Sequence, residues 1–304
     1  MKICLNPFML ETWFGGSPRP VIDLIEIADE RGFDAVVLPE HILMDPDNLD
    51  DYPYDKQSAE GRWFDEMTPF FEATTSLAAI ASRTKNVKLQ TGVMLAPLRN
   101  ASVLAKTLST IDHISDGRVE IGYGVGWLEL DYSAEGIAFE GRFGRMTEIA
   151  EACKQIWTSA PASYHGKHVN FDNVYSLPFP LQREGIPQWF GVGPSERNIE
   201  RMARVADGWC PLQVPWDVVA DTLPKIKQKM EEFGRDPETF GLRLQVIPQI
   251  TAGVVDLDAT FDTIPTLLDA GATHIEIAAL NYVASPDAFP DFVDACIVAR
   301  DKNS

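Results

Sequence analysis

The feature that most constrains the fold of this chain is a regular alternation of strand-like and helix-like segments. A short apolar run at residues 2–10, for example, is followed by residues 20–31, in which apolar residues recur at helical spacing. The pattern repeats eight times along the chain. The expected strands are residues 2–10, 34–38, 86–95, 118–123, 187–192, 209–212, 242–251 and 274–278. The expected helices are residues 20–31, 72–83, 101–114, 142–157, 196–206, 216–233, 260–270 and 287–299.

Eight strand–helix pairs in 304 residues predict an α/β fold, and specifically a closed (β/α)8 TIM barrel. An open, doubly wound sheet more often has five or six strands. Neither a linker nor an internal repeat nor a low-complexity segment divides the sequence. We therefore expect a single barrel domain over residues 1–304.

Two stretches are longer than ordinary loops. Residues 44–65 form an acidic insertion after the second strand. This insertion is either a solvated loop or, since it follows a strand on the face where barrel active sites lie, a wall of a substrate pocket. The aromatic candidates for such a wall are Tyr52, Tyr54, Trp63 and Phe64. A second insertion lies near residues 159–185, where 164–171 has the pattern of a hairpin.

Composition excludes several classes of partner. A net charge of −19 argues against nucleic acid or an anionic membrane surface as the main partner. No apolar run approaches the ~20 residues needed to span a bilayer. The cysteines are widely separated, without a CxxC pair or a histidine cluster at zinc spacing, so we expect reduced thiols, no metal site and a cytoplasmic location. They are Cys4, Cys153, Cys210 and Cys296.

Barrel enzymes build their active sites from residues just past the ends of the strands. At these positions the sequence has no pair of carboxylates, no Gly-x-Ser-x-Gly elbow and no lysine placed for a Schiff base, so hydrolase and aldolase chemistry are poorly supported. Glycines, apolar residues and one histidine, His41, remain. His41 is either a proton-transfer group, given an ordinary pKa of about 6.5, or a hydrogen-bonded structural residue.

Two glycine-rich segments follow expected strands. Residues 122–126 lack the spacing of a dinucleotide fingerprint, and their glycines either form a platform for a flat ring or relieve crowding inside the barrel. In residues 191–196, Ser195 is placed to cap a helix. The free N–H groups at such a helix start either bind a phosphate or are simply capped.

Several blocks of sequence resemble one family. Residues 117–128 and 135–142 look like the strand-four signature of the luciferase-like monooxygenase superfamily, and most resemble its branch of F(420)-dependent oxidoreductases. Other family blocks are similar to this sequence in the same order: residues 31–36 with 40–41, residues 89–93 with 97–100, and residues 204–209. The resemblance covers about residues 3–213.

The resemblance implies a barrel, commonly a homodimer, that binds a flavin-type ring at its C-terminal mouth. Gly92 and Val93 would form a strand-three bulge behind the ring, with a cis peptide in relatives, and His41 would lie near the reactive centre. The other residues implied to bind the cofactor are Gly126 and Trp127 beside the ring, and Gly191, Gly193, Pro194 and Ser195 at its phosphate. Sugar-phosphate dehydrogenases of the family carry a carboxylate where this chain has Trp127, which argues against sugar-phosphate oxidation.

Three functions follow as hypotheses. The first is an oxidoreductase that passes a hydride between coenzyme F(420) and a small organic substrate. The second is an FMN-dependent luciferase-like monooxygenase. The third is a barrel that binds a flavin or another ligand without turnover, since few acid–base groups are present.

Overall fold

A computed structural model of the chain describes residues 1–45, 47 and 65–303, and within them parallel strands form one nine-stranded sheet. These strands are β1 (Lys2–Asn6), β2 (Ala35–Leu38), β3 (Lys88–Thr91), β4 (Met94–Leu95), β5 (Ile121–Gly124), β8 (Gln188–Phe190), β9 (Gly208–Trp209), β10 (Gly241–Gln245) and β13 (His274–Ala278). Their order in the sheet is β3-β2-β1-β13-β10-β9-β8-β5-β4. All pairs between neighbouring strands are parallel.

The sheet closes because β3 and β4 together make one barrel strand. The peptide bond between Gly92 and Val93 is cis and separates the two segments. Below it β3 pairs with β2, and beyond it β4 pairs with β5. A parallel bridge between Leu89 and Val119 completes the ring. The expected (β/α)8 barrel and the kink in its third strand are therefore both confirmed.

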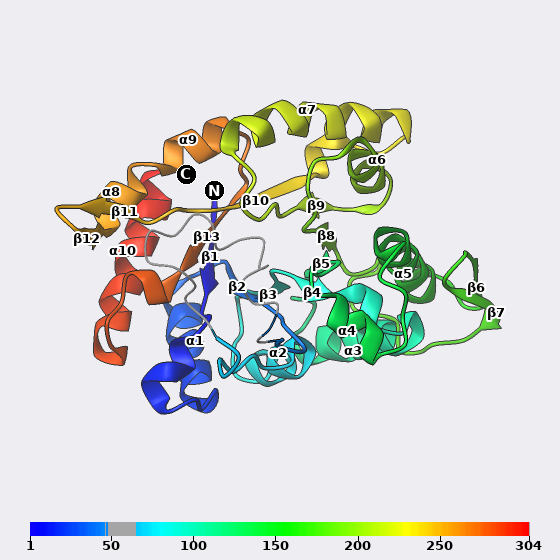
Figure 1. Cartoon of the computed structure of the whole chain (residues 1–304), viewed down its shortest axis with the longest axis horizontal. Coiled ribbons are helices and arrows are strands. Elements are labelled where there is room, and N and C mark those ends of the chain that lie inside the picture. The colour runs from blue at the N-terminus through cyan, green and yellow to red at the C-terminus, as the bar shows by residue number, and fades with distance from the viewer. Residues whose placement is uncertain (46, 48–64, 304) are drawn as a thin grey trace.

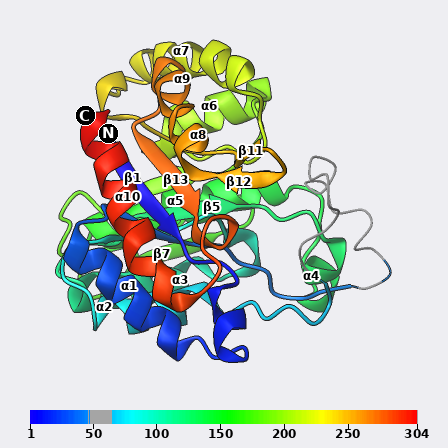
Figure 2. The ribbon, with the colours of Figure 1, turned by 90° about the vertical axis from the view of Figure 1, so that its left-hand side faces the viewer.

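Helices surround the barrel on the outside (Figure 1). They are α1 (Arg19–Arg31), α2 (Ala73–Ala81), α3 (Ala101–Ile114), α5 (Arg142–Thr158), α6 (Glu196–Val205), α7 (Trp216–Glu232), α8 (Leu257–Phe261), α9 (Ile264–Asp269) and α10 (Phe289–Lys302). Figure 2 shows α10 running beside α1, with the two chain termini close together. The predicted helices match these elements, except that residues 260–270 hold parts of two short helices.

Strand alternation separates the outer core from the barrel interior. Ile3 and Leu5 belong to the large apolar core that the strands share with the helices. Cys4, between them, instead contacts Ala35 and Val37 in a separate buried cluster. This period of two is the expected one for strands with both faces buried.

Four predicted strands, β1, β8, β9 and β10, end earlier than the sequence pattern indicates, and the difference is largest for β1 and β10. β1 ends at Asn6 because Pro7 lacks a backbone N–H and the Asn6 side chain accepts a hydrogen bond from the Phe8 N–H; residues Leu10–Phe14 form a 3-10 helix. β10 ends at Gln245, before Pro248. The residues after that proline form an antiparallel hairpin of β11 (Gln249–Thr251) and β12 (Val254–Asp256).

The insertions differ in what the structure describes. Residues 159–185 contain the expected hairpin, formed by β6 (Ala162–His165) and β7 (Asn170–Val174). The aromatic candidates Tyr52, Tyr54, Trp63 and Phe64 of the first insertion lie outside the described residues. A short helix that the sequence pattern did not indicate, α4 (Glu129–Ala134), follows β5.

The expectations about cysteines, membrane-spanning segments and metal ligands can be compared with the structure. All four cysteines are buried, and none forms a disulfide. No helix in the described ranges is both long enough and apolar enough to cross a bilayer. Across the same ranges, His, Cys, Asp and Glu side chains do not gather in groups of three or more that could hold a metal ion.

The Val93 side chain fills space inside the barrel that glycines leave open. A Cβ atom built on Gly124 would lie 2.2 Å from Val93 Cγ2, and one built on Gly191 would lie 2.4 Å from Val93 Cγ1. A Cβ on Gly92 would come within 2.6 Å of Val37 and 2.8 Å of the Arg243 guanidinium. These glycines are therefore required by packing within the barrel, as the second interpretation of residues 122–126 expects. Gly124 also lines the cavity at the barrel mouth, so its place in a ring platform stays a prediction.

We expect Gly124→Ala to lower the free energy of unfolding by about 1–3 kcal/mol, because the added methyl group overlaps Val93 in a closely packed interior. Adding Val93→Ala to this variant should restore most of the loss. Gly193→Ala is the control, since a Cβ there meets no atom within 4 Å. Denaturant unfolding of the four proteins measures the effect. Equal stability of Gly124→Ala and the parent chain would contradict the packing argument.

Candidate active site

A cavity of about 200 Å³ opens at the C-terminal ends of the barrel strands. It lies where active sites of this fold occur. The residues predicted from the sequence that line it are His41, Gly92, Val93, Gly126, Trp127 and Gly191. Gly193, Pro194 and Ser195 are not part of its lining and lie instead at the start of α6. The closed barrel thus brings together six of the nine predicted residues.

His41 follows β2 and contacts two aromatic rings at the mouth. Its ring centroid lies 4.7 Å from that of Phe70 and 6.4 Å from that of Trp127, in both cases edge to face. Burial in these surroundings lowers the pKa of His41 from 6.5 to about 4. The imidazole of His41 is therefore neutral at pH 7.

The residue before His41 is fixed by a buried ion pair. Arg99 donates to both carboxylate oxygens of Glu40, over 2.8 and 2.6 Å, and the Leu95 N–H donates to the same carboxylate. The Glu40 side chain is fully buried. Arg99 also donates to Glu72, which caps the N-terminus of α2. These hydrogen bonds connect the end of β2 to β4 and to α2. His41 follows directly after this fixed end of β2.

Asp131 is a site residue that the sequence reasoning missed. It lies on α4, lines the mouth and accepts a hydrogen bond from the Leu43 N–H. Burial, with the nearby Glu40 charge as a lesser cause, raises the pKa of Asp131 from 3.8 to about 6. No signal in the sequence identified Asp131, because the sequence pattern did not indicate α4, the helix that places this residue at the mouth.

The floor of the mouth is polar. Arg243 on β10 lies inside the barrel, and its Nε is 3.1 Å from a carboxylate oxygen of Glu276 on β13. The Asn6 amide donates to the other oxygen of Glu276 over 2.8 Å. Arg243 also donates to the Gln90 side chain and to the Thr91 carbonyl. The sequence analysis did not identify Arg243, because one arginine in an apolar strand gives no signal of its contacts.

The cysteines near this floor are not suited to nucleophilic chemistry. Cys4 and Cys210 are buried, and burial raises the pKa of both thiols. A nucleophilic cysteine needs the opposite shift, toward the thiolate. The mouth therefore offers one neutral imidazole and one carboxyl group that titrates near neutrality.

The N-terminus of α6 is a second polar region, separate from the lining of the cavity. Ser195 is its N-cap and accepts a hydrogen bond from the Asn198 N–H, while the Asn198 side chain donates to the Gly193 carbonyl. Arg201 donates to Asn198. Burial and the neighbouring charges of Arg197 and Arg204 lower the pKa of Arg201. The first two turns of α6 thus carry Arg197 and Arg201 interleaved with Glu196 and Glu200.

A family model described as luciferase-like monooxygenase matches residues 9–259 of this sequence. The chain therefore belongs to the luciferase-like monooxygenase family. Membership confirms the predicted resemblance and extends it beyond residue 213. The family consists of F(420)- or flavin-dependent oxidoreductases and monooxygenases, so an enzyme of this class is confirmed at the family level.

Two relatives illustrate the range within the luciferase-like family. An uncharacterized protein of Mycobacterium tuberculosis is 30% identical over 239 residues, which cover 77% of this chain and 82% of that protein. An F(420)-dependent glucose-6-phosphate dehydrogenase of Nocardia farcinica is 24% identical over 282 residues, covering 90% of this chain and 77% of that protein.

Solved structures share the fold of this luciferase-like chain. A monooxygenase from Streptomyces bottropensis has a TM-score of 0.75 at 22% identity, covering 99% of this chain and 98% of that one. A second structure is that of an F(420)-dependent secondary alcohol dehydrogenase, solved with an F(420)–acetone adduct. It has a TM-score of 0.73 at 18% identity, and the match covers 98% of this chain and 99% of that one. At sequence identities this low, the structural similarity establishes the barrel fold.

We expect the stability of the chain to report the titration of Asp131. Its folded-state pKa of about 6 lies above the ordinary value of 3.8, so the stability it contributes is present below about pH 4 and is lost as pH rises through about 6. Asp131→Asn should remove this dependence. The variant should therefore gain stability relative to the parent chain between pH 4 and pH 7.

Thermal melts across this pH range measure the difference. Glu129→Gln is the matched control, because Glu129 is an exposed carboxylate on the same short helix. A stability difference between parent and Asp131→Asn that does not change with pH would show that Asp131 has an ordinary pKa.

Proposed function

We propose that this chain is an oxidoreductase that transfers a hydride between coenzyme F(420) and a small organic substrate at the mouth of the barrel. The observation that carries the proposal is the cavity at the C-terminal ends of the barrel strands, lined by Gly92 and Val93 between β3 and β4, by a neutral histidine and by Trp127. The relative named an F(420)-dependent dehydrogenase supports the choice of cofactor.

The residues present fit such a cofactor at both ends. A flat ring needs backbone and aromatic surface, and the mouth supplies Val93, Gly126 and Trp127. A phosphate needs free N–H groups and positive charge, and the α6 start supplies the N–H groups next to Arg201. Gly193 faces open space there, since a Cβ would meet nothing within 4 Å. When bound, the ring supplies the two-electron chemistry.

His41 and Asp131 then have separate roles. The neutral imidazole of His41 hydrogen-bonds to the carbonyl or hydroxyl oxygen of the substrate. The carboxyl group of Asp131, with a pKa of about 6, holds or releases the proton that accompanies hydride transfer. Phe70 and Trp127 exclude water around His41. Because the family resemblance puts Trp127 where sugar-phosphate dehydrogenases carry a carboxylate, we propose a substrate other than a sugar phosphate.

The runner-up is an FMN-dependent monooxygenase at the same site. The structural neighbours that favour it are the Streptomyces bottropensis enzyme and an EDTA monooxygenase from Chelativorans, with TM-scores of 0.75 and 0.76. The ring and phosphate positions would be the same for FMN. A barrel that binds such a cofactor without turnover is the third candidate, and it is favoured by the ion pairs that already engage Glu40, Arg243 and Glu276 at the mouth, which leave few groups for acid–base chemistry.

We further propose that residues 1–304 act as one barrel domain, in the cytoplasm and as a homodimer. These three statements rest on the uninterrupted strand–helix pattern, the reduced cysteines and the family resemblance.

Binding titrations of the purified protein should give a micromolar Kd for F(420) and no measurable affinity for FMN. Ser195→Ala should weaken F(420) binding by only ~1 kcal/mol, because backbone N–H groups remain at the helix start. Gly193→Val should weaken it far more, since the side chain occupies the open space. The reverse cofactor preference selects the monooxygenase. Negligible effects of both substitutions would place the phosphate elsewhere.

We expect His41→Ala to reduce kcat about 100-fold or more while the Kd for cofactor changes little. The assay is oxidation of reduced F(420) by a panel of small ketones and enones. His165→Ala is the control, because His165 lies exposed on the β6–β7 hairpin. A fully active but less stable His41→Ala protein would make His41 structural.

A further inference from the structure

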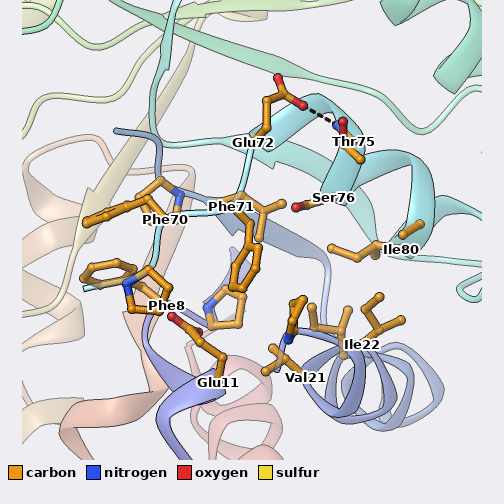
Figure 3. Close-up of a pocket in the computed structure, with 17 residues that line it drawn as sticks. Phe8, Glu11, Val21, Ile22, Phe70, Phe71, Glu72, Thr75, Ser76 and Ile80 are labelled. Carbon is orange, nitrogen blue, oxygen red and sulfur yellow. Dashed lines mark hydrogen bonds between the residues drawn. The ribbon is translucent and has the colours of Figure 1, made fainter. Parts of the chain in front are cut away.

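A second cavity of about 310 Å³ lies outside the barrel, between α1 and α2 (Figure 3). Its third side is the segment that leads into α2, including Phe70 and Phe71. The volume is at the lower end of that of small-molecule sites in proteins. Neither the proposed cofactor position nor the roles of His41 and Asp131 use this space.

The walls of this cavity, which we call the α1–α2 pocket, are mainly apolar. α1 contributes Val21 and Ile25, and α2 contributes Ala79 and Ile80. Phe8, Pro39 and Phe70 line both this pocket and the barrel mouth, so they form the partition between the two cavities. A ligand in the α1–α2 pocket would therefore lie beside, and not within, the proposed active site.

One polar group, the carboxyl group of Glu11, is buried in this apolar lining. Glu11 is only 6% exposed, and Figure 3 shows its carboxyl group directed toward the side that Phe8 forms. Burial raises its pKa, and its own backbone N–H is the one hydrogen-bond donor that counteracts this shift. No other described residue donates a hydrogen bond to this carboxyl group, and desolvating a carboxyl group with so few donors is costly, so a ligand group can bind here.

The other groups of the pocket favour a cation as that partner. Neither lysine nor arginine occurs among the described residues of its lining. The remaining carboxylate, Glu72, is exposed and already bonded to Arg99. Aromatic rings attract cations to their faces, and Phe8, Phe70 and Phe71 surround the space next to Glu11. An anion or a second carboxylate would be repelled.

We propose that the α1–α2 pocket binds a small molecule with an apolar body and one protonated amine, which pairs with Glu11. The amine supplies the charge and the N–H donors that Glu11 lacks, and the body replaces water against the apolar walls. A matching neutral alcohol offers the hydroxyl donor but not the charge. The proposal goes beyond the proposed hydride transfer and does not depend on it.

Isothermal titration calorimetry with phenethylamine and phenethyl alcohol near neutral pH tests this assignment. The parent chain should bind the amine at least about 10-fold more tightly than the alcohol. Glu11→Gln should abolish this preference while leaving alcohol affinity within about twofold, because it removes the charge and keeps the shape. Glu30→Gln, an exposed carboxylate on α1, is the matched control and should bind as the parent does.

Substitutions that fill the α1–α2 pocket test whether the probes bind there and not in the barrel mouth. Ala79→Phe should abolish binding of both probes, and Ser76→Leu is a second filling variant, with thermal melts confirming that each is folded. Amine binding in the parent should persist at saturating F(420) or FMN if either binds. Equal affinity for amine and alcohol, retention of the preference in Glu11→Gln, or undiminished binding in both folded filling variants would overturn the assignment.

Discussion

A single buried cation, the guanidinium of Arg243, connects the strands that form the floor of the site. It lies wholly inside the barrel, where an uncompensated charge would cost several kcal/mol, so its partners must be held in place. Glu276 provides the opposite charge, and Asn6 holds Glu276 from the neighbouring strand. Arg243 also binds the Thr91 carbonyl, immediately before the kink in the third strand. The position of the kinked backbone thus depends on the contacts of Arg243 with Glu276 and Thr91, and on the contact of Glu276 with Asn6.

In the mouth above this floor the same physical effect acts on two unlike groups, His41 and Asp131. Burial disfavours the charged form of each, which lowers the pKa of His41 to about 4 and raises that of Asp131 to about 6. An imidazole without charge and a carboxyl group able to carry a proton result. Hydride transfer needs few other groups from the protein, since the electrons belong to the cofactor. The scarcity of acid–base residues in the sequence is thus compatible with catalysis as well as with simple binding.

The glycines illustrate how one sequence feature acquires its meaning from packing. The run at 122–126 has a composition that suits either a ring platform or a crowded interior. In the folded chain a Cβ on Gly124 would overlap Val93, a residue from a different strand, so the glycine is needed for packing whatever binds above it. Gly193, by contrast, faces open space at the α6 start. The two residues are chemically identical, and only their neighbours in the closed barrel distinguish them.

By itself the sequence determined the alternating elements, the closed barrel, the family and six of the residues at the mouth, because periodicity and local motifs depend on near neighbours along the chain. It also indicated the kink at Gly92 and Val93. It placed four strand ends too late, by the most in β1 and β10, which end before Pro7 and Pro248. Asp131, the Arg243 network, the lowered pKa of His41 and the pocket around Glu11 were decided by the tertiary structure alone. Each depends on burial, or on contacts between residues far apart in the chain, and such contacts exist only once the strands have closed into a barrel and the helices cover it.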